Sequence, residues 1–320
     1  MHATALSSPV VVLTGASSGI GRAIANALAR RGAQVVLAAR GREALEAVAA
    51  ECELAGAATE VVLTDVTDDQ AVRALAGSAI RRFGHIDVWI NNVGVGAVGR
   101  FDEIPIETHR RVIEANLLGH MNGAHVAIAH FRARGRGTLI NMVSLGGWLS
   151  TPYTAAYTAS KFGLRGFGQS LRSELADLPD IHVCDVYPGF VDTPGVSHGA
   201  NYTAHRLRPF PPLLSPERVA QHVVRLLTHP KPIVVIGSAA RAARYTSGLL
   251  PELRGRLAKR SIDMALARAA PEPISNGNLF DVSRNHAISG GYRRAATGPW
   301  LGLGALGLAG IALYALRRHA

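Results

Sequence analysis

The chain has 320 residues, which suits one large domain or two ordinary ones, and 48% of them are hydrophobic, enough for a sizeable core. The formal net charge of +11 is typical of proteins that meet nucleic acid, an anionic membrane surface or an anionic ligand. Aromatic residues make up only 6% and do not interleave with the arginine-rich stretches, which excludes nucleic acid as the favoured partner. Two isolated cysteines and 13 histidines without ligand spacing predict neither a disulfide framework nor a metal site.

Apolar runs and helical stretches alternate through the first 240 residues. Strands are expected at 10–14, 35–39, 61–63, 88–91, 138–143, 181–187 and 233–236, and helices at 19–31, 42–54, 68–83, 107–131 and 155–178, with another beginning at 215. Apolar runs without polar alternation suit strands that are buried on both faces. The pattern predicts an α/β protein, with a Rossmann-type doubly wound parallel sheet, helices on both of its faces and a C-terminal helical extension.

A glycine-rich loop, TGASSGIG at 14–21, follows the first expected strand and precedes the first expected helix. Glycine permits positive φ angles and lets the backbone approach a pyrophosphate, while a helix N-terminus offers free N–H groups and a positive dipole end. A glycine loop in this position is typical of dinucleotide-binding proteins. The loop residues expected to bind the cofactor are Gly15, Ser17, Ser18, Gly19, Ile20 and Gly21.

A tyrosine and a lysine four residues apart, Tyr157 and Lys161, would share one face of the helix expected at 155–178. A lysine ammonium near a phenol favours the phenolate and lowers its pKa, which lies near 10 in free tyrosine. Such a pair could move a proton at neutral pH. The spacing alone is common in plain helices, but here Ser144 ends an expected strand thirteen residues upstream of Tyr157.

These motifs, in this order, resemble the short-chain dehydrogenase/reductase family over roughly residues 9–238. The resemblance implies that Tyr157 is the general acid/base, that Ser144 binds the substrate oxygen, and that Lys161 also binds the nicotinamide ribose. It implies that Asn116 supports a water that relays protons to Lys161. One position departs from the family pattern, because Val93 stands where alanine is usual. The further cofactor contacts that the resemblance implies are Asp65, Val66, Asn92, Gly94, Pro188, Gly189 and Thr193.

The choice between NAD and NADP is expected to depend on the end of the second strand. NAD-binding folds usually place a carboxylate there for the ribose 2′-hydroxyl. Here Ala39 takes the acidic position and Arg40 follows. An arginine fork binds a phosphate that a carboxylate would repel, so the sequence predicts NADP(H), with Arg40 on the 2′-phosphate. Arg22, just after the loop, is a second candidate cation.

We divide the chain into an NADP-binding catalytic domain at 1–245 with a substrate loop at about 190–214, a basic helical extension at 246–270, a linker at 271–298 and a transmembrane helix at 299–316. Residues 295–316 carry no charge and would form a helix of about 33 Å, enough to cross a hydrocarbon core of about 30 Å. We expect no signal peptide, and therefore a single-pass C-terminal anchor with the catalytic domain in the cytoplasm. The alternative is a cytoplasmic protein whose apolar end packs on the domain or at an oligomer interface.

The predicted function is hydride transfer between NADPH and a carbonyl or secondary alcohol carbon. Apolar walls are expected from Trp148, Tyr153, Phe190, Phe210 and Leu213, which favours an apolar substrate. Oligomerisation is typical of the resembled family, although no pattern here identifies an interface. One alternative is a membrane-tethered NADP-binding redox sensor without turnover, and another is a basic scaffold on anionic lipid; the full catalytic set argues against both.

Overall fold

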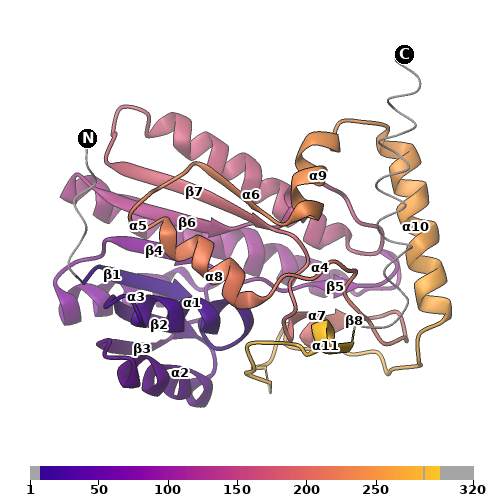
Figure 1. Cartoon of the computed structure of the whole chain (residues 1–320), viewed down its shortest axis with the longest axis horizontal. Helices are drawn as coiled ribbons and strands as arrows, with labels where there is room; N and C mark the ends of the chain where they lie inside the picture. Colours follow the sequence, from indigo (N-terminus) through magenta and orange to yellow (C-terminus); the bar gives the residue numbers. More distant parts are fainter. Residues whose placement is uncertain (1–7, 284, 296–320) are drawn as a thin grey trace.

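The computed structural model describes residues 8–283 and 285–295. Its centre is a parallel sheet of seven strands in the order β3-β2-β1-β4-β6-β7-β9, which confirms the predicted doubly wound fold (Figure 1). The strands are β1 (Val10–Thr14), β2 (Gln34–Ala39), β3 (Thr59–Leu63), β4 (Val88–Asn91), β6 (Gly137–Met142), β7 (Ile181–Pro188) and β9 (Ile233–Ile236). Two short strands, β5 (Ala97–Val98) and β8 (Ala200–Asn201), pair apart from this sheet.

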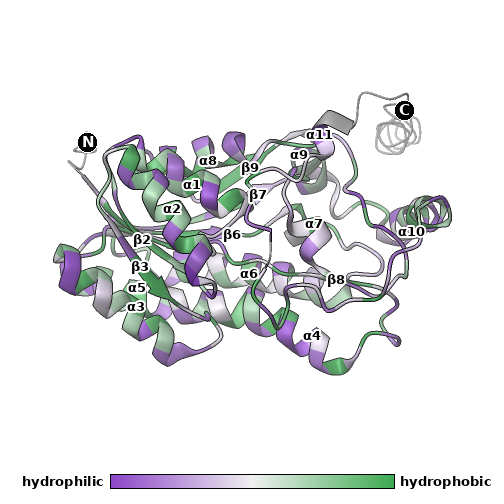
Figure 2. Cartoon of the chain, turned by 90° about the horizontal axis from the view of Figure 1, so that it is seen from below, coloured by the Kyte–Doolittle hydropathy of each residue, from purple (hydrophilic) through white to green (hydrophobic). Residues whose placement is uncertain are grey.

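Helices cover both faces of the sheet (Figure 2). One layer contains α1 (Gly19–Ala29), α2 (Arg42–Leu54) and α8 (Pro216–Arg225); the other contains α3 (Asp69–Phe83), α5 (Gly119–Arg134) and α6 (Ala155–Glu174). Side chains of a strand alternate between the faces. Val11 and Leu13 therefore pack with α1, whereas Val12, between them, packs with α3. Two apolar cores result, which is why the strands read as continuous apolar runs.

The single helix predicted at 107–131 is three segments in the structure. α4 (Ile106–Ile113) and α5 are joined by a π-helical turn, Glu114–Leu118, which contains the predicted site residue Asn116. A π-turn inserts one residue into the helical repeat and occurs often at functional sites. Sequence periodicity over 25 residues does not reveal such a one-residue shift.

A row of polar side chains crosses the buried centre of the sheet. Asn91, Asn141 and Asp185 are lateral neighbours on β4, β6 and β7. Asn91 Nδ2 donates to Asn141 Oδ1 at 3.1 Å, and Asn141 Nδ2 donates to Asp185 Oδ1 at 3.2 Å. Arg172 of α6 completes the row, with Nη1 2.7 Å from Asp185 Oδ2. The row ties α6 to the strands at a fixed height.

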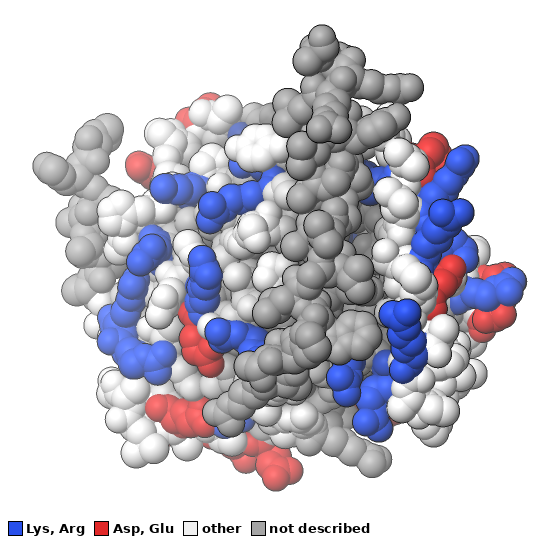
Figure 3. All heavy atoms as spheres, turned by 45° about the vertical axis from the view of Figure 1, so that its right-hand side comes forward, with Lys and Arg blue, Asp and Glu red and all other residues white. Residues whose placement is uncertain are grey.

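The C-terminal part begins with α9 (Ser238–Thr246) and α10 (Pro251–Ala267), and α10 confirms the predicted C-terminal helical extension. α10 projects at one end of the molecule and buries none of its residues (Figure 1). Figure 3 shows lysine and arginine side chains outnumbering acidic ones on this side, in keeping with the net charge of +11.

The described part of the predicted linker does not extend away from the domain. Residues 271–283 and 285–291 run back along it, past α7 (Gly195–His198), and lead into α11 (Tyr292–Ala295). Glycine- and serine-rich composition suggested a free segment, but the backbone of this stretch is bonded to the domain through Asn201, His198 and Asp192. The predicted transmembrane segment 299–316 lies outside the described residues. Among 8–283 and 285–295, no helix has the length and apolarity needed to cross a membrane.

Candidate active site

A cavity of about 480 Å³ opens at the carboxyl ends of the central strands. In open α/β sheets this edge, where the strand order reverses, is the usual ligand site. The cavity is lined by all but one of the predicted site residues, namely Gly15, Ser17, Ser18, Gly19, Ile20, Gly21, Arg40, Asp65, Val66, Asn92, Gly94, Ser144, Tyr157, Lys161, Pro188, Gly189 and Thr193. The exception is Asn116.

The glycine loop between β1 and α1 has the form that a pyrophosphate needs. Gly15 and Gly19 have φ angles of +66° and +52°, where a side chain would be strained. A Cβ atom at Gly21 would lie 1.9 Å from the carbonyl oxygen of Gly15, so the helix packs too closely on the loop for any other residue. Asn92 fixes the position of the loop, because its Nδ2 donates to the carbonyl oxygen of Gly15 at 3.1 Å. The cradle and the N-terminus of α1 therefore fit a dinucleotide.

Ser144, Tyr157 and Lys161 meet at the other end of the cavity. Ser144 has a φ of +148°, a strained conformation for serine that occurs mainly at functional sites. Its Oγ accepts from the N–H of Gly146 at 3.0 Å, and a Cβ at Gly146 would lie 3.5 Å from this Oγ and 3.2 Å from the Tyr157 ring. Lys161 Nζ is 5.7 Å from the centre of that ring. The predicted trio is therefore assembled on one wall.

Burial dominates the electrostatics of this trio. Desolvation raises the pKa of Tyr157, and the nearby Ser144 hydroxyl opposes that rise. Desolvation also lowers the pKa of Lys161 to about 7, while its Nζ donates to the carbonyl oxygen of Met142 at 3.2 Å. The phenol pKa is therefore not lowered as the sequence led us to expect, because burial of the phenolate is the largest influence on this pKa and raises it. At neutral pH the Tyr157 hydroxyl therefore keeps its proton.

Asn116 lies behind the cavity wall, on the π-turn. Its Oδ1 accepts from the N–H of Val95 at 2.8 Å, and its Nδ2 donates to the Val95 carbonyl oxygen at 2.8 Å and to Ser160 Oγ at 3.1 Å. Ser160 Oγ in turn donates to the carbonyl oxygen of Tyr157 at 2.7 Å. In the structure Asn116 thus holds the loop after β4 against the helix that carries Tyr157.

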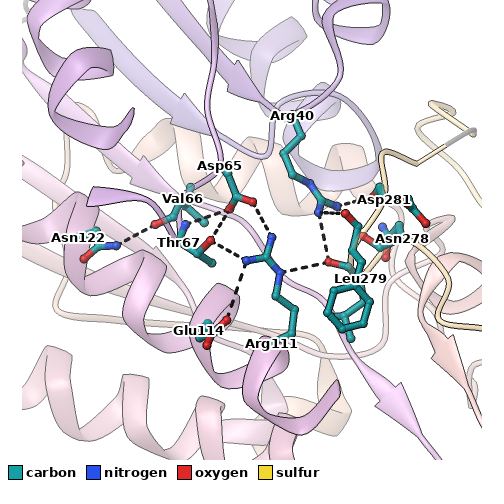
Figure 4. Close-up of polar contacts among 11 residues, drawn as sticks. Arg40, Asp65, Val66, Thr67, Arg111, Glu114, Asn122, Asn278, Leu279 and Asp281 are labelled. Carbon is teal, nitrogen blue, oxygen red and sulfur yellow. Dashed lines mark hydrogen bonds and ion pairs between the residues drawn. The ribbon is translucent and has the colours of Figure 1, made fainter. Parts of the chain in front are cut away.

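The opposite end of the cavity contains two arginines (Figure 4). Arg40 was predicted as a site residue. Arg111 of α4 was not, because no motif in the neighbouring sequence indicates that it reaches the site. Arg111 donates to Asp65 Oδ2 at 2.5 Å and to Thr67 Oγ1 at 2.6 Å. Burial alone would raise the pKa of Asp65, but hydrogen bonds from Thr67 and Arg111 outweigh it and lower that pKa. The second candidate cation, Arg22, is paired with Glu51.

The apolar walls differ in part from those expected. Phe190 lines the cavity, and Phe210 packs against it with ring centres 6.1 Å apart. Trp148 instead packs on Tyr187, and the Tyr153 hydroxyl donates to Asp263 of α10 at 2.5 Å. These two large side chains point away because the loop after β6 turns them toward α9 and α10. The apolar residues that line the catalytic end include Val95, Ala97, Val98, Leu145, Val196 and Leu207.

Comparisons with known proteins agree with this geometry. The profile of the family described as short chain dehydrogenase matches residues 9–201. This chain belongs to the short-chain dehydrogenase/reductase family. It is an oxidoreductase of that family, whose members use a nicotinamide cofactor. A relative, "Uncharacterized oxidoreductase YxnA" of Bacillus subtilis, is 35% identical over 281 residues, covering 87% of this chain and 79% of the relative.

Solved structures of short-chain dehydrogenases share the architecture. A single-residue variant of actinorhodin polyketide ketoreductase with NADPH has a TM-score of 0.67 and 31% identity, and the match covers 73% of this chain and 97% of that one. The alcohol dehydrogenase of Thermococcus sibiricus, complexed with 5-hydroxy-NADP, has a TM-score of 0.61 and 31% identity, with 71% and 94% covered. In both, the matched part leaves out about a quarter of this short-chain dehydrogenase.

Proposed function

We propose that this protein is an NADP(H)-dependent reductase of carbonyl groups, able to oxidise the corresponding alcohols, with Tyr157 as the general acid/base. The observation that carries the proposal is one continuous cavity, with the Ser144–Tyr157–Lys161 trio at one end and the glycine cradle and Arg40 at the other. The bound cofactor would supply or accept the hydride. The two NADP-type ligands named in the structures of similar proteins support the same cofactor.

The chain's own residues would hold the substrate and move the proton. The Ser144 hydroxyl, fixed by its strained backbone, would donate a hydrogen bond to the substrate oxygen. The Tyr157 hydroxyl would transfer its proton to that oxygen during reduction, and its raised pKa keeps this proton in place at neutral pH. Lys161 would bind the ribose and return a proton toward Tyr157. Asn116 would keep Tyr157 in position through Ser160.

We propose an apolar substrate, because the walls next to Tyr157 are aliphatic and aromatic. Val95, Leu145 and Phe190 line the cavity that contains Tyr157, and the lining glycines add no polar side chain. Apolar walls with a few convergent polar groups are typical of sites for small apolar ligands. We also propose that the uncharged segment 299–316 attaches the protein to a membrane, which the sequence alone supports.

The decisive test is Tyr157→Phe, which removes the hydroxyl and keeps the ring. Turnover of a ketone or aldehyde with NADPH should fall by a factor of about 100 to 10,000, the usual contribution of a general acid, with NADPH affinity nearly unchanged. Tyr245→Phe is the matched control, since Tyr245 is 75% exposed on α9 and should keep full activity. A Tyr157→Phe variant that retains more than about a tenth of the activity would show that another group supplies the proton.

A further inference from the structure

A segment from the C-terminal part of the chain lies across the adenosine end of the cavity. We call residues 278–283 and 285–290 the strap. Near its start, Leu279 is 1% exposed and packs in an apolar cluster with Ala97 and Ile104. Just past its other end, Asp192 accepts from the N–H groups of Tyr292 at 2.9 Å and Arg293 at 3.2 Å. The strap is therefore anchored to the catalytic domain at both ends.

Between these anchors the strap contacts the first turn of α1 and the residue that follows Arg40. The N–H of Gly19, in the glycine cradle, donates to the carbonyl oxygen of Ala287 at 3.0 Å. Arg22 Nη1 donates to the carbonyl oxygen of His286 at 2.8 Å. Val282 faces Gly41, the residue after Arg40, so closely that a Cβ there would lie 2.6 Å from Val282 Cγ1.

The densest contacts involve Arg40 (Figure 4). Its Nη2 donates to the carbonyl oxygens of Asn278 at 2.5 Å and Asp281 at 2.7 Å. Its Nη1 donates to those of Leu279 at 3.2 Å and Phe280 at 3.3 Å. Arginine has five N–H donors, and a bidentate phosphate contact needs two of them in one fork. The strap thus engages both terminal nitrogens that a phosphate would use.

The strap carbonyls form a concave set of partial negative charges, as phosphate oxygens do. Arg111 is a second donor to these carbonyls, because its Nε donates to the Leu279 carbonyl oxygen at 3.4 Å. The strap does not close this end of the cavity: Asp65 and Val66 line it together with Leu279 and Val282, and Arg111 bridges the Asp65 carboxylate and the Leu279 carbonyl oxygen. The strap forms one wall of this site, and its backbone carbonyl oxygens accept hydrogen bonds from the Arg40 guanidinium.

We propose that the backbone carbonyls of residues 278–281 occupy the site of the 2′-phosphate, so that NADP(H) must displace this part of the strap from Arg40 while NAD(H) binds with the strap in place. The inference rests on the proposed function, which assigns Arg40 to the 2′-phosphate. Strap closure then weakens NADP(H) binding selectively. The C-terminal part of the chain thereby sets the ratio of the affinities of the enzyme for NADP(H) and NAD(H).

A disulfide between Gly41→Cys and Val282→Cys tests this by holding the strap closed. A Cβ at Gly41 would lie 4.0 Å from the Cβ of Val282, within the 3.5–4.5 Å range of disulfides. The native cysteines would not interfere, because Cys52 and Cys184 are buried and burial raises their pKa values to about 11 and about 12. Fluorescence titration with NADPH and NADH reports binding without turnover, and Val282→Cys alone controls for the oxidant.

The oxidised double variant should bind NADPH at least about tenfold more weakly than the same protein after reduction, the loss expected when one charged hydrogen-bonding partner is withheld. NADH affinity should be equal in the two forms. NADPH affinity that is unchanged by oxidation would overturn the strap proposal alone. Equal loss of both cofactors would also overturn it, in favour of a lid over the whole site. A reduced form without preference for NADPH would refute the assignment of Arg40 itself.

Hydrogen exchange in the unaltered full chain provides a second measurement that needs no engineered residue. The N–H of Asn278 donates to the His198 carbonyl oxygen at 2.7 Å, and that of Leu279 to Asn276 at 3.2 Å. Displacement of the strap should speed exchange at these two amides when NADPH is added, and NADH should have no such effect. Slower or unchanged exchange with NADPH would contradict displacement.

Discussion

Lys161 should make the stability of this protein depend on pH in a direction opposite to that of an ordinary paired lysine. Its side chain is 2% exposed, and burial lowers its pKa from 10.5 to about 7. In the unfolded chain the pKa returns to its ordinary value. Between about pH 7 and 10.5 the unfolded state therefore binds a proton that the folded state lacks, so stability rises with pH across this window.

The replacement Lys161→Met keeps the length of the side chain and removes the charge. One pKa unit corresponds to about 1.4 kcal/mol, so the fall to about 7 sets a ceiling of about 5 kcal/mol on the cost of the buried ammonium below pH 7. We expect Lys161→Met to be more stable than the unaltered protein by several kcal/mol at about pH 6.5, and this difference to vanish near pH 10.5.

Urea denaturation at steps between about pH 6.5 and 10, with both proteins free of cofactor, measures that difference. Buried acids act in the opposite direction: the raised pKa values of Tyr157 and Cys52 make the folded protein less stable at high pH. Both proteins contain these two residues, so their contributions cancel in the difference. Lys231→Met is the control, because Lys231 is exposed and its replacement removes a lysine without relieving a buried charge. A difference for Lys161→Met that is flat with pH would refute the reasoning.

Three further outcomes are expected. Arg40→Ala should weaken NADPH binding by about 1.5–3 kcal/mol, the range for a charged hydrogen bond, and leave NADH binding nearly unchanged in a titration; equal losses would show that Arg40 does not bind the 2′-phosphate. Gly123→Ala should lower the free energy of unfolding by about 1–3 kcal/mol in urea, because its Cβ would lie 2.3 Å from Asn91 Oδ1 and 2.6 Å from Trp89 Nε1; an unchanged midpoint would contradict this packing. Truncation after Gly298 should release the enzyme from the membrane fraction in active form, and a full-length protein that is monodisperse without detergent would count against the anchor.

The sheet could be predicted from the sequence because its central strands are buried on both faces and read as apolar runs. β4 and β9 have the predicted bounds. The glycine loop and the Tyr157–Lys161 pair could also be predicted from the sequence, because each is a local motif. One helical turn brings Tyr157 and Lys161 to the same face. The expectation that Ser144 joins them came from the family resemblance.

Features that depend on contacts between residues far apart in the sequence could not be predicted from it. Arg111 meets Asp65 only because α4 packs beside the end of β3, and no local pattern predicts that distance. The strap was predicted as a linker, because glycine and serine describe a chain without apolar periodicity. It is held by backbone hydrogen bonds, such as that from the Gly290 N–H to the Asp192 carbonyl oxygen, which composition does not encode. The predicted lowering of the Tyr157 pKa was wrong for a related reason. Burial raises this pKa, and burial is produced by residues that are distant in the sequence.

The polar row across β4, β6 and β7 has a consequence for how this sequence can vary. Asn91, Asn141 and Asp185 each satisfy their neighbour's buried groups, and Arg172 neutralises the last of them. A single replacement leaves a partner unpaired in the core, whereas apolar replacement of all members removes the need for pairing within the row. Substitutions at these positions should thus be strongly non-additive. The row would change as a set over evolutionary time, and a drifting homologue would pass through less stable intermediates.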